Sequence, residues 1–200
     1  MQSSFPSVYT PRFVCSTECG SSYKFLHFMT YKTAKTSILK SYDFTVNQRI
    51  MDFNQETYSL YPGYFTFTFV RNPWDRIVSC YHFFRRKQTD LKFPWTEKFK
   101  EYFMNDFSYF IKNITKIDDK HVYPQFLLFP STIDFIGRFE NLQQDYDVVC
   151  DKIGMPPKKL QVFNLTSHKH YTEYYNDETV GIVAELYSKD IDYFDYKFGE

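Results

Sequence analysis

Two short segments of this chain carry residues suited to binding phosphate groups. Residues 31–37 read YKTAKTS and combine two lysines with three Ser or Thr hydroxyls. Arg71 opens the second segment, RNPWDRIVS, which ends at Ser79. Each segment follows an apolar run and precedes a helical pattern, so both are expected where a strand ends and a helix begins. Backbone N–H groups lack partners at such a junction and the helix dipole favours an anion, so the pattern predicts phosphate binding.

The Arg71 segment suits a terminal phosphate monoester. An arginine fork can bind two phosphate oxygens, and the Ser79 hydroxyl lies about two helical turns further on. A structural interpretation stays open beside this one. Asn72 would then cap the helix, Pro73 would take its first position, Arg71 would pair with a carboxylate, and Ser79 would lie in an interface.

The first segment has the composition of a phosphate loop without the glycines of a Walker A loop. The GxxxxGK[ST] pattern is absent, whereas Lys32 and Lys35 stand beside hydroxyls. The alternative is a helix N-cap with solvated lysines. Taken together, one loop suits a 5′-phosphate with an attached group and the other suits a second phosphate.

Strands and helices alternate along the chain. Short strands are expected at Tyr23–Met29, Phe65–Val70 and Ile133–Ile136. Helices are expected at Ser37–Phe44, Trp74–Lys87, Phe99–Ile114, Leu142–Ile153 and Asp177–Phe194. This order predicts an α/β fold with a mainly parallel sheet flanked by helices. Residues 1–21, rich in Ser, Thr and Pro, are expected to be loosely ordered, and residues 22–200 to form a single domain.

Composition narrows the functional classes. The formal net charge is zero, so nothing global favours nucleic-acid binding. The chain has no run of about 18 apolar residues and no basic leader before an apolar core, so we expect no membrane span and a soluble cytoplasmic protein. The four cysteines are expected to be reduced, and Cys15 and Cys19 lack a second ligand pair, so no metal site is expected.

With these residues in place, the chain resembles the P-loop-like sulfotransferases that use 3′-phosphoadenosine-5′-phosphosulfate (PAPS), specifically their carbohydrate (Golgi-type) branch. The family loop commonly reads PKTAGTS, matched here by residues 31–37. The RNPxxRxxSxY motif is complete, and an IGRFENL segment follows at Ile136–Leu142. A tail like HYxxYY…ELYxxDIxxFxYxF matches His170–Phe198. The resemblance covers roughly residues 23–198 of the sequence.

The resemblance implies sulfuryl transfer from PAPS to a hydroxyl or amine, most readily on a carbohydrate, with release of 3′,5′-ADP and no metal. Catalysis would depend on positioning and charge stabilisation, as in phosphoryl transfer. Lys32 would neutralise charge on the leaving 5′-phosphate. The residues implied to bind the cofactor are Lys32, Thr33, Ala34, Lys35, Thr36, Ser37, Arg71, Ser79, Lys169 and Tyr171.

The general base stays open among several residues. His121 lies in an irregular stretch where related carbohydrate enzymes often place a histidine, and it is the predicted base or acceptor contact. His168 and His170 lie in a loop that could close over the nucleotide. Glu140 could act as a base or form a buried ion pair. His27 lies inside a strand pattern and is expected in the core.

Two positions depart from the family loop. Tyr31 replaces the usual proline, and Lys35 replaces a glycine that would allow a positive φ. The substitution leaves open a reshaped loop, a direct contact from Lys35, or weakened PAPS binding. A phosphotransferase and a non-catalytic nucleotide- or glycan-binding relic are the alternatives to a sulfotransferase. The sequence identifies neither the acceptor nor the oligomeric state.

Overall fold

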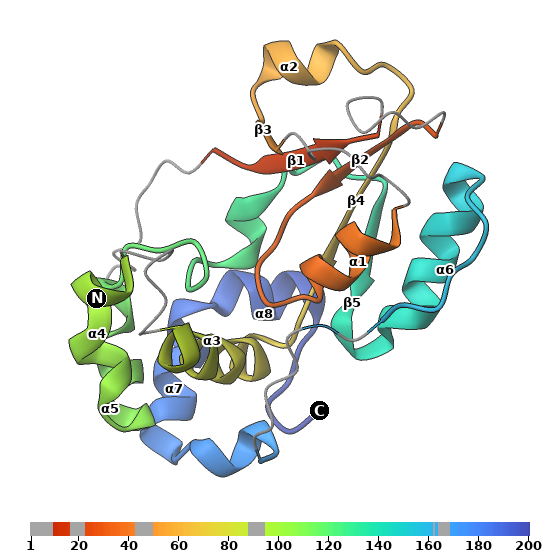
Figure 1. The fold of residues 1–200 in the computed structure, drawn as a ribbon. Coiled ribbons are helices and arrows are strands. Elements are labelled where there is room, and N and C mark those ends of the chain that lie inside the picture. Colours follow the sequence, from red (N-terminus) through yellow and green to blue (C-terminus); the bar gives the residue numbers. More distant parts are fainter. Residues whose placement is uncertain (1–9, 17–22, 43–49, 88–94, 162, 164–168) are drawn as a thin grey trace. The chain divides into compact units, whose positions relative to one another are not determined.

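The computed structural model describes residues 10–16, 23–42, 50–87, 95–161, 163 and 169–200 (Figure 1). The chain divides into two compact units. The sheet unit comprises Val8–Arg71 and Gln125–Asn164. The helical unit comprises Met1–Ser7, Asn72–Pro124 and Leu165–Glu200. The chain passes from the sheet unit to the helical unit directly after Arg71.

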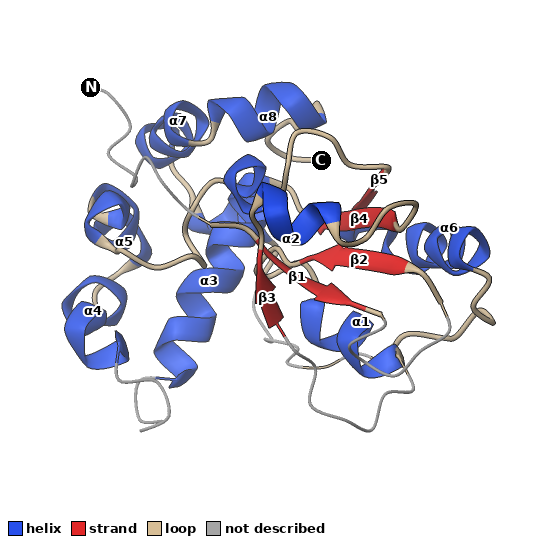
Figure 2. Cartoon of the chain, turned by 90° about the horizontal axis from the view of Figure 1, so that it is seen from above, coloured by secondary structure: helices blue, strands red, loops and turns tan. Residues whose placement is uncertain are grey.

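The sheet unit is built on a five-stranded sheet in the order β3-β1-β2-β4-β5 (Figure 2). The strands are β1 (Arg12–Cys15), β2 (Phe25–Phe28), β3 (Ile50–Asp52), β4 (Phe65–Val70) and β5 (Phe135–Arg138). The expected α/β fold with a helix-flanked sheet is confirmed. Strands β2, β4 and β5 are parallel, whereas β1 is antiparallel to both β2 and β3.

Strand β1 lies within the segment, residues 1–21, that was expected to be loosely ordered. Its Phe13, Val14 and Cys15 are fully buried. The Ser- and Pro-rich composition around these three residues hid a strand of only four residues. Because β1 adds an antiparallel pairing on each side, the sheet is parallel only on its β2-β4-β5 side.

The period of two along FTFTFV divides β4 between the two faces of the sheet. Phe67 and Phe69 face a core that contains Ile38 of α1 (Lys35–Ser41) and Tyr146 of α6 (Leu142–Ile153). The opposite face carries aromatic rings in tilted and edge-on contact that continue toward α2 (Gln55–Ser59), and α1 and α2 lie on opposite sides of the strands in Figure 2. Those rings belong to Phe13, Phe28, Phe53, Tyr58 and Tyr61.

His27 lies in the core, as its strand pattern predicts. Its ring stacks on Phe67 with centroids 4.7 Å apart, and Nδ1 lies 3.0 Å from the hydroxyl of Tyr42. Burial, assisted by the positive charge of Lys35, lowers the pKa of His27 to about 3. The imidazole is therefore neutral at physiological pH and serves packing in this unit.

This shift predicts acid sensitivity. The unfolded chain binds a proton at His27 below about pH 6.5, whereas the folded protein does so only near pH 3. The free energy of unfolding should therefore fall between these values, with a contribution of up to about 1.4 kcal/mol per pH unit. Denaturant titrations at several pH values measure the free energy of unfolding of wild type and His27→Phe. This free energy should depend less on pH in the variant, and an equal pH dependence of the two proteins would contradict the assignment.

Gly137 is required by a ring on the neighbouring strand. It pairs with Phe69 across β4 and β5, and a Cβ built at Gly137 would lie 2.5 Å from Cε1 of that ring. Phe69 is itself fully buried in the core under α1 and α6, so the ring has little room to move.

Gly137→Ala should therefore destabilise the protein by about 1–3 kcal/mol through overpacking. Gly181→Ala is the matched control, because no atom lies within 4 Å of its built Cβ and it sits inside a helix. This control should be neutral or stabilising by up to about 1 kcal/mol. Thermal unfolding of both variants measures the difference, and equal effects would refute the role of Phe69.

The helical unit contains α3 (Pro73–Lys87), α4 (Trp95–Met104), α5 (Phe107–Lys112), α7 (Asp177–Leu186) and α8 (Ser188–Phe194). Two of the predicted helices, Phe99–Ile114 and Asp177–Phe194, are each divided into two. The first breaks because Asp106 caps α5, where its carboxylate accepts from the Tyr109 N–H at 2.8 Å. The second breaks at Tyr187. Short 3₁₀ helices are η2 (Ile114–Lys116) and η5 (Tyr171–Tyr174) here, with η3 (Gln125–Leu128) and η4 (Phe139–Asn141) in the sheet unit.

Two absences concern only the described part of the chain. None of its helices has both the length and the apolar character needed to cross a bilayer. The same residues contain no cluster of three or more His, Cys, Asp or Glu side chains arranged to hold a metal ion.

Candidate phosphate-binding site

The loop between β2 and α1 has an unusual backbone. Lys32 (φ 69°) and Ala34 (φ 60°) are both left-handed, and the intervening Thr33 is not. Alternation of this kind turns successive N–H groups toward one point and is typical of anion-binding nests. The predicted phosphate loop thus has a backbone suited to its role.

Threonine hydroxyls attach this loop to the neighbouring strand. The side-chain oxygens of Thr30 and Thr33 lie 2.8 Å apart, and the Thr30 hydroxyl donates to the carbonyl of Phe69 at the end of β4. Thr33 is only 2% exposed. Its hydroxyl therefore holds the loop in shape, which leaves its backbone as the group available to a ligand. Ser37 is also buried, whereas Thr36 is partly exposed.

Lys35 does not occupy the position that needs a glycine. It is the first residue of α1 and has no positive φ, and the left-handed residues are Lys32 and Ala34. The backbone at residue 35 therefore does not need the conformational freedom that a glycine would give. The Lys35 ammonium lies 4.5 Å from the centroid of the Tyr31 ring. The two departures from the family loop thus contact each other as a cation–π pair.

The positions of the left-handed residues predict opposite effects of glycine at neighbouring sites. Ala34→Gly should stabilise the protein by up to about 1 kcal/mol, because it relieves a non-glycine residue from the left-handed region. Lys35→Gly should destabilise it by about 0.5–1 kcal/mol, because a helical residue gains freedom in the unfolded chain and loses the Tyr31 contact. Thermal unfolding distinguishes the two, and stabilisation by Lys35→Gly would contradict this geometry.

Arg71 stands at the carboxyl end of β4, next to the loop that follows β2. Its Nη1 donates to the Lys32 carbonyl at 3.1 Å, and its guanidinium carbon lies 3.9 Å from the centroid of the Phe139 ring. The side chain is held in the sheet unit with Arg71 only 8% exposed. The structure therefore places Arg71, the first residue of the second predicted segment, against the loop of residues 31–37, because parallel neighbouring strands end at the same edge.

Gln125 fixes the backbone of Arg71 from both sides. Its Oε1 accepts from the Arg71 N–H and its Nε2 donates to the Arg71 carbonyl, both at 2.9 Å. Gln125 is completely buried. Sequence reasoning missed this residue and gave Phe139 no role. The available signals were a lone amide in the apolar stretch VYPQF, and the position of Phe139 within the IGRFENL segment.

The motif residues after Arg71 shape the helical unit. Asn72 caps α3, because its Oδ1 accepts from the Trp74 N–H at 3.1 Å, as the structural interpretation predicted. Arg76 is fully buried and donates to the carbonyls of His121 and Tyr123, both at 2.8 Å. Ser79 is buried on α3. Its predicted phosphate contact stays a prediction.

His121 is paired with a carboxylate that the sequence analysis did not single out. Its Nδ1 lies 2.5 Å from Oδ1 of Asp119, which also accepts from the His121 N–H at 2.8 Å. Burial raises the pKa of the Asp119 carboxyl, but the hydrogen bonds and charge of His121 outweigh it and leave that pKa lowered. The D-x-H spacing was the only signal in the sequence.

Two predicted nucleotide contacts lie in the helical unit. Lys169 is exposed and pairs with Glu173 at 3.5 Å. Tyr171 is buried, and its hydroxyl donates to the Glu200 carbonyl at 3.0 Å and accepts from the Gly199 N–H at 2.7 Å. In this structure Tyr171 binds the C-terminal segment of the described chain.

The remaining candidate bases are His170, Glu140 and His168. His170 is exposed, with Nδ1 2.7 Å from the Thr172 hydroxyl. Glu140 is exposed on η4, so the alternative of a buried position for this residue is wrong. His168 lies outside the described residues.

The match to a family model covers both segments that are predicted to bind phosphate. A family model described as "Sulfotransferase family" matches residues 14–197. An uncharacterized protein of Archaeoglobus fulgidus is 30% identical over 112 residues, which make up 56% of this chain and 86% of that protein. No solved structure gives a significant match.

Proposed function

The chain belongs to the sulfotransferase family, and on that premise we propose that PAPS is its sulfuryl donor and a carbohydrate hydroxyl or amine its acceptor. Sulfuryl transfer as such follows from the family. The donor, the acceptor class and the residue roles are the proposal. The product of the donor would be 3′,5′-ADP, which carries two phosphate groups.

The observation that carries this proposal is the hydrogen bond between Arg71 and the Lys32 carbonyl in the sheet unit. It joins a cationic fork to a loop with nest-like backbone, and thus places two kinds of phosphate-binding group side by side. The guanidinium stacks on Phe139 through its face, while its five N–H donors lie in its plane. A fork of this kind can hold a carbonyl and a phosphate oxygen together, which suits the 3′-phosphate.

Lys32 would supply the charge that the reaction needs. As the bond between sulfur and the 5′-phosphate oxygen breaks, negative charge grows on that phosphate, and an ammonium placed there stabilises it. Arg71 fixes the carbonyl of the residue that carries this ammonium. The backbone of residues 33–37 would hold the phosphosulfate, and Lys35, held on Tyr31, would add positive charge to the loop.

The acceptor must lose a proton as it attacks sulfur, and His121 is the proposed base. Ser79, Lys169 and Tyr171 remain proposed nucleotide contacts on the strength of the family motifs alone. The carbohydrate acceptor rests on the resemblance to the carbohydrate branch.

Calorimetric titration tests the donor site directly. The ligands are 3′,5′-ADP, 5′-AMP, and ATP with and without magnesium. Magnesium-independent binding of 3′,5′-ADP that clearly exceeds binding of 5′-AMP would support a site for two phosphates. A preference for ATP with magnesium would overturn the proposal in favour of a phosphotransferase, and no binding would favour a relic.

Arg71→Ala should weaken 3′,5′-ADP binding by about 2–4 kcal/mol, roughly 30- to 1,000-fold, because it removes a charge held in a buried position. Arg71→Lys should fall between wild type and alanine, because it keeps the charge but loses the fork. Calorimetry measures both variants, and thermal unfolding checks that each is folded.

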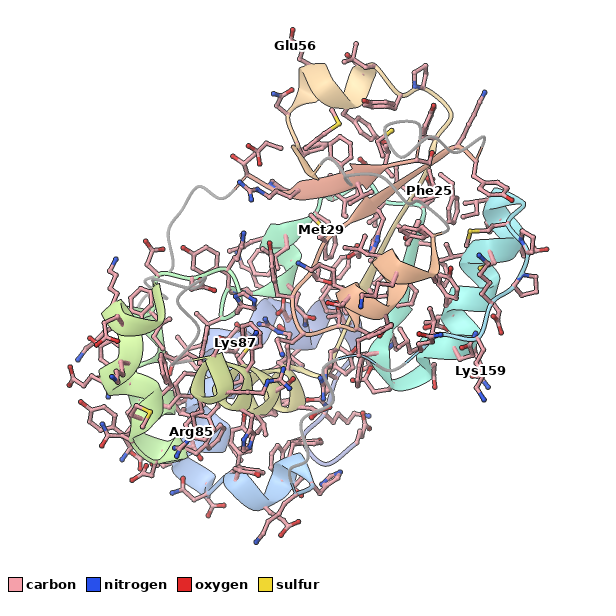
Figure 3. All side chains as sticks on the ribbon, viewed as in Figure 1. Phe25, Met29, Glu56, Arg85, Lys87 and Lys159 are labelled. Atoms are coloured by element: carbon pink, nitrogen blue, oxygen red, sulfur yellow. The ribbon has the colours of Figure 1, made fainter. Side chains whose placement is uncertain are left out.

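The matched control is Lys159→Ala, which removes a positive charge elsewhere in the same unit. Lys159 is exposed and points away from the ribbon (Figure 3). This variant should bind 3′,5′-ADP like wild type. An unchanged affinity in folded Arg71→Ala would refute the assigned site, and an equal loss in the control would reduce the effect to net charge.

A further inference from the structure

Asp119 and His121 form a hydrogen-bonded pair within the helical unit. One carboxylate oxygen of Asp119 accepts from two donors on the same residue, the backbone N–H of His121 and, at 2.5 Å, its Nδ1. Both side chains are largely buried, with 11% of Asp119 and 14% of His121 exposed. A short bond in a place with little water is strong enough to decide which ring nitrogen carries the proton.

We propose that Asp119 is a positioning residue for the reaction, which holds the proton of His121 on Nδ1 and so directs the basic lone pair of the ring to Nε2. The inference rests on the proposed function, because it assigns the work of the base to that nitrogen. To the proposed base it adds its carboxylate partner, Asp119, its tautomer, with the proton on Nδ1, and its basic atom, Nε2.

Contacts with α3 hold His121 in position. Its ring stacks on Phe83 with centroids 5.0 Å apart and meets Phe84 edge-on. Its carbonyl accepts from Arg76 and from the thiol of Cys80, both on α3. Aromatic rings and a carbonyl contact do not select a tautomer, whereas a carboxylate 2.5 Å from Nδ1 does.

Charges near the pair act in both directions. The guanidinium of Arg76 on α3 opposes protonation of His121, and the Asp119 carboxylate favours it. Within the same loop, the positive charge of Lys120 helps to lower the pKa of Asp119, and the Tyr123 hydroxyl donates a hydrogen bond to the Asp118 carboxylate. The net effect of Asp119 is to stabilise the imidazolium that forms during the reaction.

Nε2 of neutral His121 takes the proton of the acceptor hydroxyl or amine, the acceptor atom forms its bond to sulfur, and the bond from sulfur to the 5′-phosphate oxygen breaks with its electron pair left on 3′,5′-ADP. Asp119 remains ionised throughout and stabilises the positive ring, as the carboxylate of a Ser-His-Asp triad does.

Asp119→Asn tests the proposal, with Asp118→Asn as the matched loss of a carboxylate in the same loop. Nitrogen-15 NMR of the ring nitrogens reports the tautomer and pKa of His121 without any acceptor. Wild type and Asp118→Asn should carry the proton on Nδ1. Asp119→Asn should lower the pKa of His121 and mix or invert the tautomers.

The kinetic arm uses PAPS with unsulfated glycosaminoglycan oligosaccharides as the acceptor probe and follows release of 3′,5′-ADP. In Asp119→Asn, kcat should fall about 10- to 100-fold with KM for PAPS within about threefold, and the acid limb of the pH profile should move to lower pH. Asp118→Asn should keep the wild-type profile.

Three results would overturn the assignment. They are an Nε2 proton in the wild-type ring, an unchanged pH profile in Asp119→Asn, or an equal loss of kcat and thermal stability in both variants, which would indicate a structural role. Failure of the proposed function is seen separately, as absence of 3′,5′-ADP binding in calorimetry. If the oligosaccharides are not turned over, the NMR arm alone decides.

Discussion

The hydrogen bond from the Arg71 guanidinium to the Lys32 carbonyl is the contact on which the candidate site depends. It is possible because β2 and β4 are parallel neighbours, so the loops that follow them leave the same edge of the sheet. The register of β2 and β4 sets the distance between Arg71 and the loop after β2. The Thr30 hydroxyl attaches this loop to β4, and Gln125 holds the backbone of Arg71. Without this shared edge, Arg71 and the loop of residues 31–37 would not be in contact.

The departures from the family loop are best understood as a pair. Glycine provides conformational freedom, but the structure needs that freedom at Lys32 and Ala34, where a lysine and an alanine adopt left-handed backbone. At residue 35 the backbone is helical, so a side chain is tolerated there. The Tyr31 ring beneath the Lys35 ammonium then offers a partner that proline would not. Lys35 thus adds a positive charge to the loop at a position where the backbone is helical.

Sequence reasoning predicted what depends on local pattern. The alternation of FTFTFV gave β4 with its observed ends, and the Gly154 stop gave α6. It missed β1, because four residues in a polar segment become a strand only when β2 and β3 pair with them. It also missed Gln125 and Asp119, whose importance arises from contacts with Arg71 and His121 rather than from any spacing that the chain displays. Partners brought by tertiary structure leave little trace in a single sequence.

The RNPxxRxxSxY motif mixes residues with different tasks, and its arginines show this most clearly. Arg71 is held against the loop of residues 31–37 in the sheet unit, whereas Arg76 is wholly buried in the helical unit, with carbonyls of the His121 loop as its partners. A buried guanidinium is costly to desolvate, and hydrogen bonds to the carbonyls of His121 and Tyr123 offset part of that cost and restrain the loop. That loop carries the Asp119–His121 pair. The motif that supplies Arg71 therefore also holds, through Arg76, the segment that carries the proposed base.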